Sequence, residues 1–172
     1  LPGRYTDFDA GGSYYNCAIA GDGAVECSTG YNTVGQASPP TGSFVQVTVG
    51  DFHSCALDAD GAVQCWGSST DPPGVFTQID AGNTHTCGLR PSGEAYCWGS
   101  NTYGQATALG GVFTEISCGG PASCGLRTDG TIECWGRNNH GQSTPPTGSE
   151  VAGGYLVSNP SCCMACCGSL GW

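Results

Sequence analysis

Short runs of alternating apolar and polar residues recur along the chain, and each pair of runs is separated by a loop that ends in glycine. In residues 55–67, Leu57 and Val63 flank the loop Ala59-Asp60-Gly61. The same arrangement occurs in residues 17–29, 87–99 and 124–136. A period of two residues on both sides of such a loop is typical of two antiparallel strands joined by a three-residue turn. The pattern therefore predicts four β-hairpins.

The register of these hairpins places one cysteine of each first strand opposite one cysteine of the second strand. Directly opposed residues of antiparallel strands have Cα atoms about 4.5–5.5 Å apart, which suits a disulfide. Closing each short loop should add about 2–3 kcal/mol of stability. We therefore expect four hairpin disulfides: Cys17–Cys27, Cys55–Cys65, Cys87–Cys97 and Cys124–Cys134. Leu57, Leu89 and Leu126 share one position of the pattern, and we expect them in the repeat core.

Two further elements recur with the hairpins. Phe44, Phe76 and Phe113 each lie eleven residues before the first hairpin cysteine. An Asn-x-x-Gly-Gln motif follows the first, third and fourth hairpins, whereas a shorter, proline-containing bridge follows the second. A period of about 32–38 residues with about four short extended segments is typical of a repeat β architecture, usually a β-propeller.

The repeats divide the chain into four full units and a remainder. The predicted units are residues 4–42, 43–74, 75–111 and 112–148, and residues 149–172 form a degenerate, cysteine-rich unit or cap. The sequence contains no periodic helical run and no apolar stretch of about 18 residues. The predicted fold is all-β, a propeller-like array of four full blades and a degenerate C-terminal fifth unit.

The repeat has a recognisable form, Cys-Gly-Leu-x-x-x-Gly-x-x-x-Cys-Trp-Gly-x-Asn-x-x-Gly-Gln, preceded in two copies by Gly-x-x-His-x-Cys. It resembles the repeat of the regulator of chromosome condensation family, and the resemblance covers residues 4–148. The resemblance implies seven-bladed propellers that act as exchange-factor, chromatin-binding or enzyme-inhibiting surfaces. This chain differs from that pattern in its paired cysteines and in having four full repeats.

Charge and cysteine content restrict the partners and the compartment. Fourteen acidic residues stand against four arginines and no lysine, which gives a formal charge of −10. Nucleic acids and anionic membranes are therefore not expected as partners, since both attract clusters of basic residues. Thirteen cysteines indicate an oxidising compartment, and we expect a secreted protein. A first residue other than methionine and the lack of a charged-then-apolar leader fit a mature chain or a processed fragment.

Five cysteines remain outside the hairpins: Cys118, Cys162, Cys163, Cys166 and Cys167. Because five is odd, at least one must be a free or capped thiol or pair with another chain. Cys162-Cys163-x-x-Cys166-Cys167 offers four thiolates at a spacing that could suit zinc. In a chain with so many pairable cysteines, interchain or C-terminal disulfides are the preferred interpretation, so no metal is expected.

Other motifs favour structural roles over catalysis. Asp58-Ala-Asp60-Gly61 resembles the start of a calcium loop, but the later ligands are absent and turn chemistry explains it. His53, His85 and His140 suggest a triad with Ser54 or Ser123. However, His53 and His85 share one repeat position, where the fourth copy has Ala122, so packing is the preferred role. Trp66, Trp98 and Trp135 also share one position, which indicates inter-blade core, with a sugar-stacking platform as the alternative.

These features predict a non-enzymatic, extracellular structural protein without a cofactor, whose units self-associate into a fibre or a larger assembly. An array of repeats that does not close leaves apolar faces and strand edges uncovered. A compact four- or five-bladed ring would cover them internally, whereas head-to-tail contacts between chains, the preferred interpretation, would cover them by polymerisation. The alternative is a secreted binding module, a lectin or an inhibitor of a protein or enzyme, which takes a glycan or a protein ligand.

Overall fold

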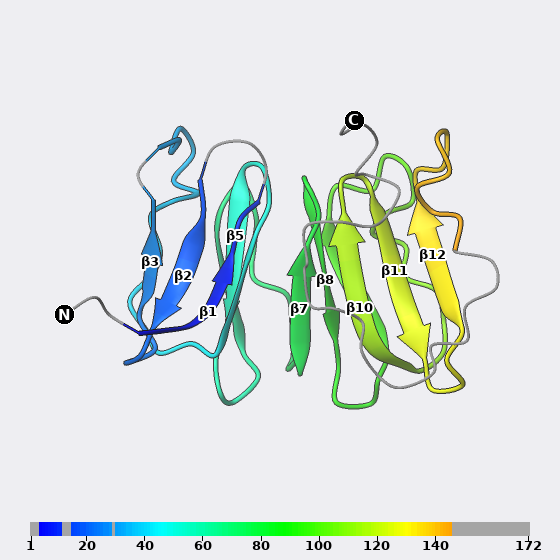
Figure 1. Ribbon diagram of the computed structural model, residues 1–172, viewed down its shortest axis with the longest axis horizontal. Coiled ribbons are helices and arrows are strands. Elements are labelled where there is room, and N and C mark those ends of the chain that lie inside the picture. Colours follow the sequence, from blue (N-terminus) through cyan, green and yellow to red (C-terminus); the bar gives the residue numbers. More distant parts are fainter. Residues whose placement is uncertain (1–3, 12–14, 29, 146–172) are drawn as a thin grey trace, which may run out of the picture.

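The computed structural model describes residues 4–11, 15–28 and 30–145, and within them all regular structure is β-strand (Figure 1). The strands form four three-stranded antiparallel sheets, each in the order of the chain. Blade 1 contains β1 (Tyr5–Asp9), β2 (Cys17–Ala20) and β3 (Val25–Cys27). Blade 2 contains β4 (Gln46–Val49), β5 (His53–Leu57) and β6 (Val63–Gly67). Blade 3 contains β7 (Gln78–Ala81), β8 (His85–Leu89) and β9 (Ala95–Gly99). Blade 4 contains β10 (Phe113–Gly119), β11 (Ala122–Arg127) and β12 (Ile132–Gly136).

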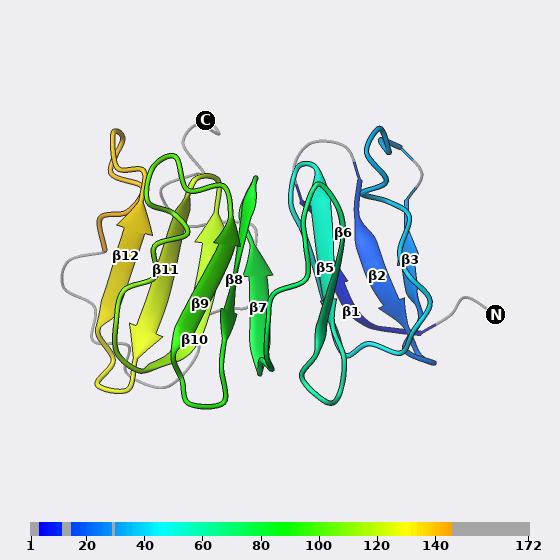
Figure 2. The same cartoon turned by 180° about the vertical axis from the view of Figure 1, so that it is seen from behind.

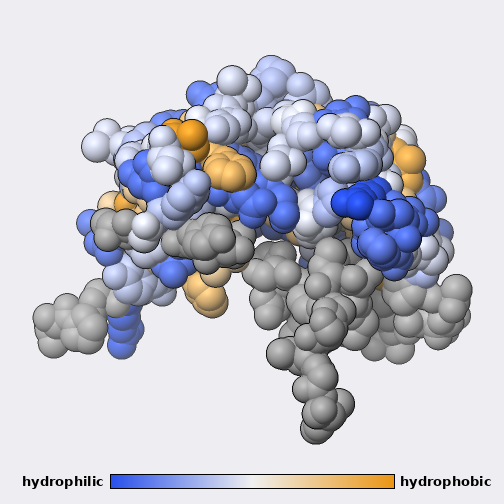
Figure 3. All heavy atoms as spheres, turned by 90° about the horizontal axis from the view of Figure 1, so that it is seen from above, coloured by the Kyte–Doolittle hydropathy of each residue, from blue (hydrophilic) through white to orange (hydrophobic). Residues whose placement is uncertain are grey.

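The blades stand side by side in chain order, as both views of the ribbon show (Figures 1 and 2). The first strands are neighbours in space, because β1 contacts β4, β4 contacts β7, and β7 contacts β10. Seen from above, the described atoms form an arc (Figure 3). This arrangement, with first strands innermost, is that of a β-propeller, and the predicted all-β, propeller-like class is confirmed.

The predicted three-residue turns have glycine in the left-handed region of backbone conformation. Gly61 and Gly93 have φ of 86° and 82°. The Gly61 N–H donates to the carbonyl of Asp58, while the Asp58 carboxylate accepts from the N–H groups of Asp60 and Ala62. Asp58 and Asp60 therefore belong to a hydrogen-bonded turn, which is the ordinary role of aspartate at this position.

Within the described residues, the core consists of three apolar clusters, each of which lies between two adjacent blades. In the middle cluster, Leu57 and Val63 of blade 2 pack with Phe76, Ile79 and Trp98 of blade 3. Trp66 and Trp135 hold the equivalent places in the other two clusters. The alternating pattern of each strand thus buries its apolar side chains against an adjacent blade rather than within its own sheet.

One expectation about the repeat unit was wrong. The sequence suggested about four extended segments per unit, whereas each described sheet has three strands. The Asn-x-x-Gly-Gln motif forms a hydrogen-bonded loop. Asn32 Oδ1 accepts from the Ala37 N–H at 2.9 Å, and Asn101 Oδ1 accepts from the Ala106 N–H at 2.9 Å. These side chains supply the backbone with local partners, so the segment does not need a strand neighbour.

The predicted fifth unit, residues 149–172, lies outside the described residues, and so do Cys162, Cys163, Cys166 and Cys167. Within the described part of the chain, no helix has the length and apolar character needed to cross a membrane.

Candidate functional site

Adjacent blades are linked by a repeated hydrogen-bond arrangement that we call the inter-blade clamp. The Gln46 side chain of blade 2 donates to the carbonyl of Ile79 and accepts from its N–H, both at 3.0 Å. Gln78 of blade 3 makes the same pair of bonds to Ile116 of blade 4, at 3.0 and 3.1 Å. Asp7 of blade 1 makes one of these two bonds: its carboxylate accepts from the Val47 N–H at 2.8 Å, but it has no donor for the Val47 carbonyl.

A second row of polar side chains crosses the same innermost strands. Asp9 accepts from the Val49 N–H at 2.7 Å, Thr48 Oγ1 accepts from the Ala81 N–H at 2.8 Å, and Asp80 accepts from the Cys118 N–H at 2.6 Å. Burial raises the pKa of the Asp80 carboxyl well above its usual range, and the bond from Cys118 opposes that shift. Burial likewise raises the pKa of Asp9. These carboxyls are structural acceptors within the arc.

The histidines predicted to pack between blades lie in the joints. His53 Nε2 is 2.8 Å from Thr86 Oγ1 of the next blade, and His85 Nε2 is 2.7 Å from Ser123 Oγ. Burial lowers the pKa of each imidazole to about 4. His140, in contrast, is exposed on the loop after blade 4. Both joint histidines are therefore neutral at physiological pH and link blades.

The hydroxyl groups of the candidate serine nucleophiles make hydrogen bonds within the fold. Ser54 and Ser123 donate to the carbonyls of Gln36 and Gln105, at 3.0 and 3.1 Å. These two carbonyls, which belong to the Asn-x-x-Gly-Gln loops, accept a second bond from the indoles of Trp66 and Trp135, at 2.7 and 2.9 Å. The buried indole N–H of Trp98 has no such partner, because the bridge that precedes blade 3 lacks the motif.

The cysteines lie where the hairpin register puts them. Disulfides join Cys17 to Cys27, Cys55 to Cys65, Cys87 to Cys97, and Cys124 to Cys134, with Cα atoms 4.0 Å apart in each pair. Cys118 is buried on β10, near His85 and Cys87, with their ligand atoms within 4.8 Å of one another. Because the Cys87 sulfur is bonded to Cys97, it offers no thiolate, and this group is not a zinc site.

The first strand of blade 1 carries an open apolar face. Val47, Ile79 and Ile116 occupy equivalent positions, opposite Ala56, Gly88 and Gly125, and only 3%, 0% and 3% of their surfaces are exposed. Phe8 occupies this position in blade 1, opposite Ala18, and is 74% exposed. Tyr5, at the position of the buried Phe44, is 54% exposed. We call Tyr5 and Phe8 the N-terminal open face.

Blade 4 carries the complementary surface. Glu115 lies opposite Leu126, just as Gln46 and Gln78 lie opposite Leu57 and Leu89. Glu115 therefore occupies the clamp position, facing away from blade 3. Leu126 and Ile132 are partly exposed, although the equivalent Leu57 and Val63 are buried. We call Glu115, Leu126 and Ile132 the C-terminal open face; no fifth blade stands against it in the described part of the chain.

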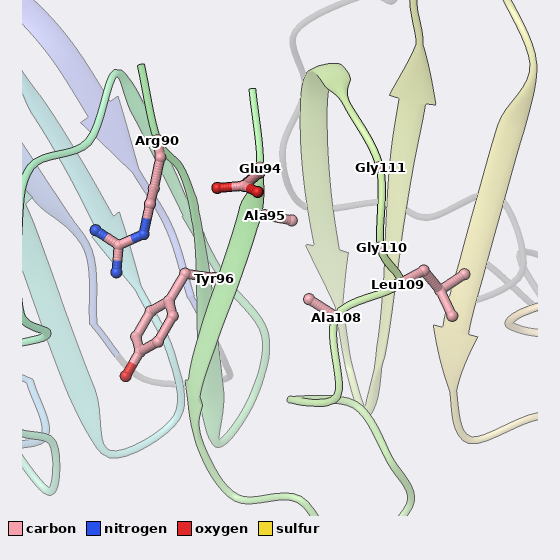
Figure 4. A pocket seen from close by; sticks show the side chains of 8 residues that line it. All are labelled: Arg90, Glu94, Ala95, Tyr96, Ala108, Leu109, Gly110 and Gly111. Atoms are coloured by element: carbon pink, nitrogen blue, oxygen red, sulfur yellow. The ribbon is translucent and has the colours of Figure 1, made fainter. Parts of the chain in front are cut away.

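A shallow groove of about 250 Å³ lies on blade 3, beside the segment that leads to blade 4. Figure 4 shows Arg90 and Tyr96 near one another on one side, and Leu109 on the other. The Arg90 guanidinium lies 4.8 Å from the centre of the Tyr96 ring and 4.9 Å from that of Phe76, and it donates to the carbonyl of Pro73. Glu94 adds a carboxylate at the rim.

Sequence reasoning missed the clamp residues. The signal was present, because a polar or acidic residue directly precedes the apolar Phe8, Val47, Ile79 and Ile116 in every copy. Only the neighbouring strand shows that the side chain reaches across the joint to main-chain groups.

Solved structures support the fold. The ectodomain from the Physcomitrella patens receptor kinase CR4 is 29% identical, with a TM-score of 0.70 over 80% of this chain and 43% of its own. The CRINKLY WD40 ectodomain from the Arabidopsis thaliana receptor kinase ACR4 is 28% identical, with a TM-score of 0.63 over 75% and 48%. Prp20p from Saccharomyces cerevisiae is 21% identical, with a TM-score of 0.62 over 78% and 44%, and shares the fold. The chain thus spans less than half the length of each. A search of curated proteins finds no match.

The sequence also matches a known repeat. The Regulator of chromosome condensation (RCC1) repeat matches residues 44–71, 76–105 and 113–142, which together make up just over half of the chain. These segments contain the strands, turns and tryptophans of blades 2, 3 and 4. The chain belongs to the RCC1 repeat family.

Proposed function

We propose that this chain is an extracellular structural module that associates with copies of itself, through its two open faces, into a fibre or larger assembly. The observation that carries the proposal is the exposure of Phe8 at a position that is buried in every internal joint. A buried phenylalanine side chain gains about 1.5–3 kcal/mol over an exposed one, so covering this face is favourable.

Self-association through these faces would be directional. Each copy has one N-terminal and one C-terminal open face, and the two faces differ. Contacts of this kind join copies head to tail, and they produce a filament when the rotation between copies does not close a ring. The free strand edge of β1 would be covered at the same time, which is how proteins avoid uncontrolled strand pairing.

An extracellular location is supported by two observations. Four disulfides staple the described blades, and such bonds persist in oxidising compartments. The two plant structures with 28–29% identity are ectodomains of receptor kinases. A non-enzymatic role is supported by the joint residues, since His53, His85, Ser54 and Ser123 are all engaged in hydrogen bonds within the fold.

A binding module is the second candidate, and the groove beside Arg90 and Tyr96 favours it. An aromatic ring, a guanidinium and a carboxylate at one rim offer contacts for a glycan or a protein segment. Among similar solved structures, Prp20p, the yeast RCC1, has been studied for its binding to Gsp1p and histones and has also been solved with Kap60 bound. A glycan array and Tyr96→Ala test this role; saturable binding that Tyr96→Ala abolishes would favour it.

We also propose that residues 4–42, 43–74, 75–111 and 112–148 act as the structural units, with residues 149–172 as a degenerate, cysteine-rich repeat or cap. The pairing of Cys118, Cys162, Cys163, Cys166 and Cys167 stays a prediction: they form interchain or C-terminal disulfides. Non-reducing gels of the native protein detect interchain disulfides, and peptide mapping identifies which cysteines are paired.

Light scattering and negative-stain electron microscopy of the full chain test self-association. We expect species heavier than one chain at micromolar concentration, and we expect Phe8→Asp to reduce them, because a buried carboxylate without a partner is costly. Tyr103→Asp is the control, since Tyr103 is a similarly exposed aromatic residue on the loop after blade 3. A wild-type protein that stays monomeric throughout would overturn the proposal.

A further inference from the structure

The internal joints define what an open face needs from its partner. Two of the three internal clamps use a side chain that both donates to a carbonyl and accepts from an N–H of the same apolar residue, whereas Asp7 only accepts from the Val47 N–H, to which no other carboxylate is bonded. Gln46 and Gln78 meet this requirement through their amide groups, on Ile79 and Ile116. The apolar residue then inserts beside a leucine and a β-branched or small residue of the preceding blade.

At the C-terminal open face, the clamp position holds a carboxyl group in place of an amide. Ionised Glu115 has only acceptors, so it could accept from an N–H but could not donate to a carbonyl. Protonated Glu115 has one hydroxyl donor and one carbonyl acceptor, which is the same pattern as glutamine. The Glu115 side chain makes no hydrogen bond within the described residues, and burial raises its pKa.

The N-terminal open face offers the matching groups. Phe8 has the position of Ile79 and Ile116, whose main-chain groups receive the clamps, on the edge of β1 that does not pair with β2. The Asp7 carboxylate next to it already accepts a bond from the Phe8 N–H as well as from Val47. An N–H that bonds the carboxylate of the preceding residue can also bond a second acceptor from another blade. The Ala81 N–H, for example, lies 2.8 Å from Thr48 Oγ1 and 3.1 Å from the carboxylate of Asp80. Two ionised carboxylates at one N–H would repel each other, whereas a neutral Glu115 would not.

The apolar parts of the two faces also correspond. Leu126 and Ile132 occupy the positions of Leu57 and Val63, which cover Phe76 and Ile79 inside the chain. Tyr5 and Phe8 occupy the positions of Phe76 and Ile79. The two open faces thus carry apolar side chains at the four positions that meet in an internal joint. These side chains are exposed or partly exposed in the single chain.

We infer that the C-terminal open face of one copy docks on the N-terminal open face of a second copy, with Glu115 clamping the main chain of Phe8, and that this joint requires Glu115 in its neutral, protonated form. The inference rests on the proposed self-association, and it adds the partner, the contact residues and their regulation. Acid therefore strengthens the joint.

Other charged groups lie on the elements packed on each side. On blade 4, Arg127 of β11 pairs with Glu133 of β12. Asp80 of β7 and His85 of β8 contact the Cys118 N–H and Ser123 in the joint with blade 3. On the docking side stand Arg4, Asp7, Asp9 and Glu26, the last of which accepts from the Tyr5 hydroxyl. Because several of these also titrate, a change of pH alone does not identify the responsible group, and the test needs substitutions at Glu115.

Analytical ultracentrifugation of the full chain at pH 7.5 and pH 5.5 tests the inference, with circular dichroism to verify folding at both values. We expect wild-type association to strengthen about tenfold at the lower pH, as uptake of one proton allows. Glu115→Gln should associate at pH 7.5 as strongly as the wild type does at pH 5.5, and should lose most of the pH dependence. Glu115→Ala should associate weakly at both values, and Glu94→Gln, an exposed control, should behave as the wild type.

The outcomes separate this inference from the proposed function. If the wild type associates but Glu115→Gln matches it at both pH values, or associates more weakly, the inference is wrong while self-association stands. If no variant and no condition gives association, both are overturned. If Glu115→Ala associates as strongly as Glu115→Gln, the clamp is not part of the joint.

Discussion

The first strands of blades 1 and 3 follow the same sequence pattern, but their apolar side chains differ in exposure. Ile79 and Phe8 occupy one place in the repeat, yet Ile79 is fully buried and Phe8 is the most exposed of the large apolar side chains described. The difference comes from the neighbour. Ile79 has blade 2 before it, and Phe8 has no described blade before it. In this fold a blade does not bury its own apolar residues, because an adjacent blade does so.

The polar positions follow the same rule. The second and third internal joints have Gln46 and Gln78, which complete a two-bond clamp, while the last blade has Glu115; the first joint has Asp7, which makes one bond. Internal joints have His53 and His85, each bonded to the next blade, while the last blade has Ala122. The end of the arc thus differs chemically from its interior, which is consistent with an end that takes a different partner.

The largest expected effect separates the two apolar positions. Ile79→Ala should lower the free energy of unfolding by about 2–5 kcal/mol, since it leaves a cavity between blades 2 and 3. Phe8→Ala should change it by less than about 0.5 kcal/mol, as for an exposed site. Denaturant unfolding at low protein concentration measures both values. A large loss with Phe8→Ala would mean that the chain itself covers the N-terminal open face.

A smaller effect concerns acid and the joint histidines. The pKa of histidine is ordinarily 6.5, and burial lowers it to about 4 for His53 and His85. Between these two pH values the unfolded chain binds protons that the two folded histidines do not. Stability therefore falls as the pH falls through this window. The loss should be about 1–3 kcal/mol per histidine. The raised pKa values of Asp9 and Asp80 act in the opposite direction, because those folded carboxyls take up protons first.

The comparison of variants isolates the histidine contribution. His85→Gln retains a donor for Ser123 and should flatten the decline of stability between pH 6.5 and 4. His140→Gln, at an exposed position, should leave the decline unchanged. Thermal unfolding across this pH range measures the slopes. Equal slopes for wild type and His85→Gln would show that His85 does not contribute.

The smallest effect compares two internal joints. Trp135→Phe should cost about 1 kcal/mol, because it removes the indole bond to the Gln105 carbonyl. Trp98→Phe removes a buried N–H that has no partner, so its cost should be smaller by about the same amount. Parallel denaturant titrations measure the difference. A larger cost for Trp98→Phe would indicate that its indole has a partner after all.

Much of the fold was predictable because its determinants are local. Turn glycines such as Gly61 fix the hairpin loops, and a loop of fixed length fixes which cysteines face each other. Cys55 and Cys65 therefore lie opposite each other in the structure as their spacing requires. The number of strands per blade was less predictable, since the Asn-x-x-Gly-Gln loop satisfies its backbone through side chains rather than through a sheet.

The candidate site was predictable only in part. The sequence indicated that the repeat positions of Phe8 and Phe44 are apolar in every copy. It did not indicate in which copy these side chains would remain exposed. The roles of Gln78 and Glu115 also depended on the next blade, because a polar residue on a strand normally faces water. Seeing that Gln78 reaches the main chain of Ile116 required the packing of two sheets.

By itself, the sequence determined the hairpins, their register, the pairing of their cysteines and the family, because each depends on residues within about 40 positions of one another. Only the tertiary structure decided that His53 and His85 are neutral links between blades, that Ser54 and Ser123 donate to loop carbonyls, and that Phe8 is exposed. Those properties depend on contacts between sheets, where burial sets both the protonation of a group and the surface that remains for a partner.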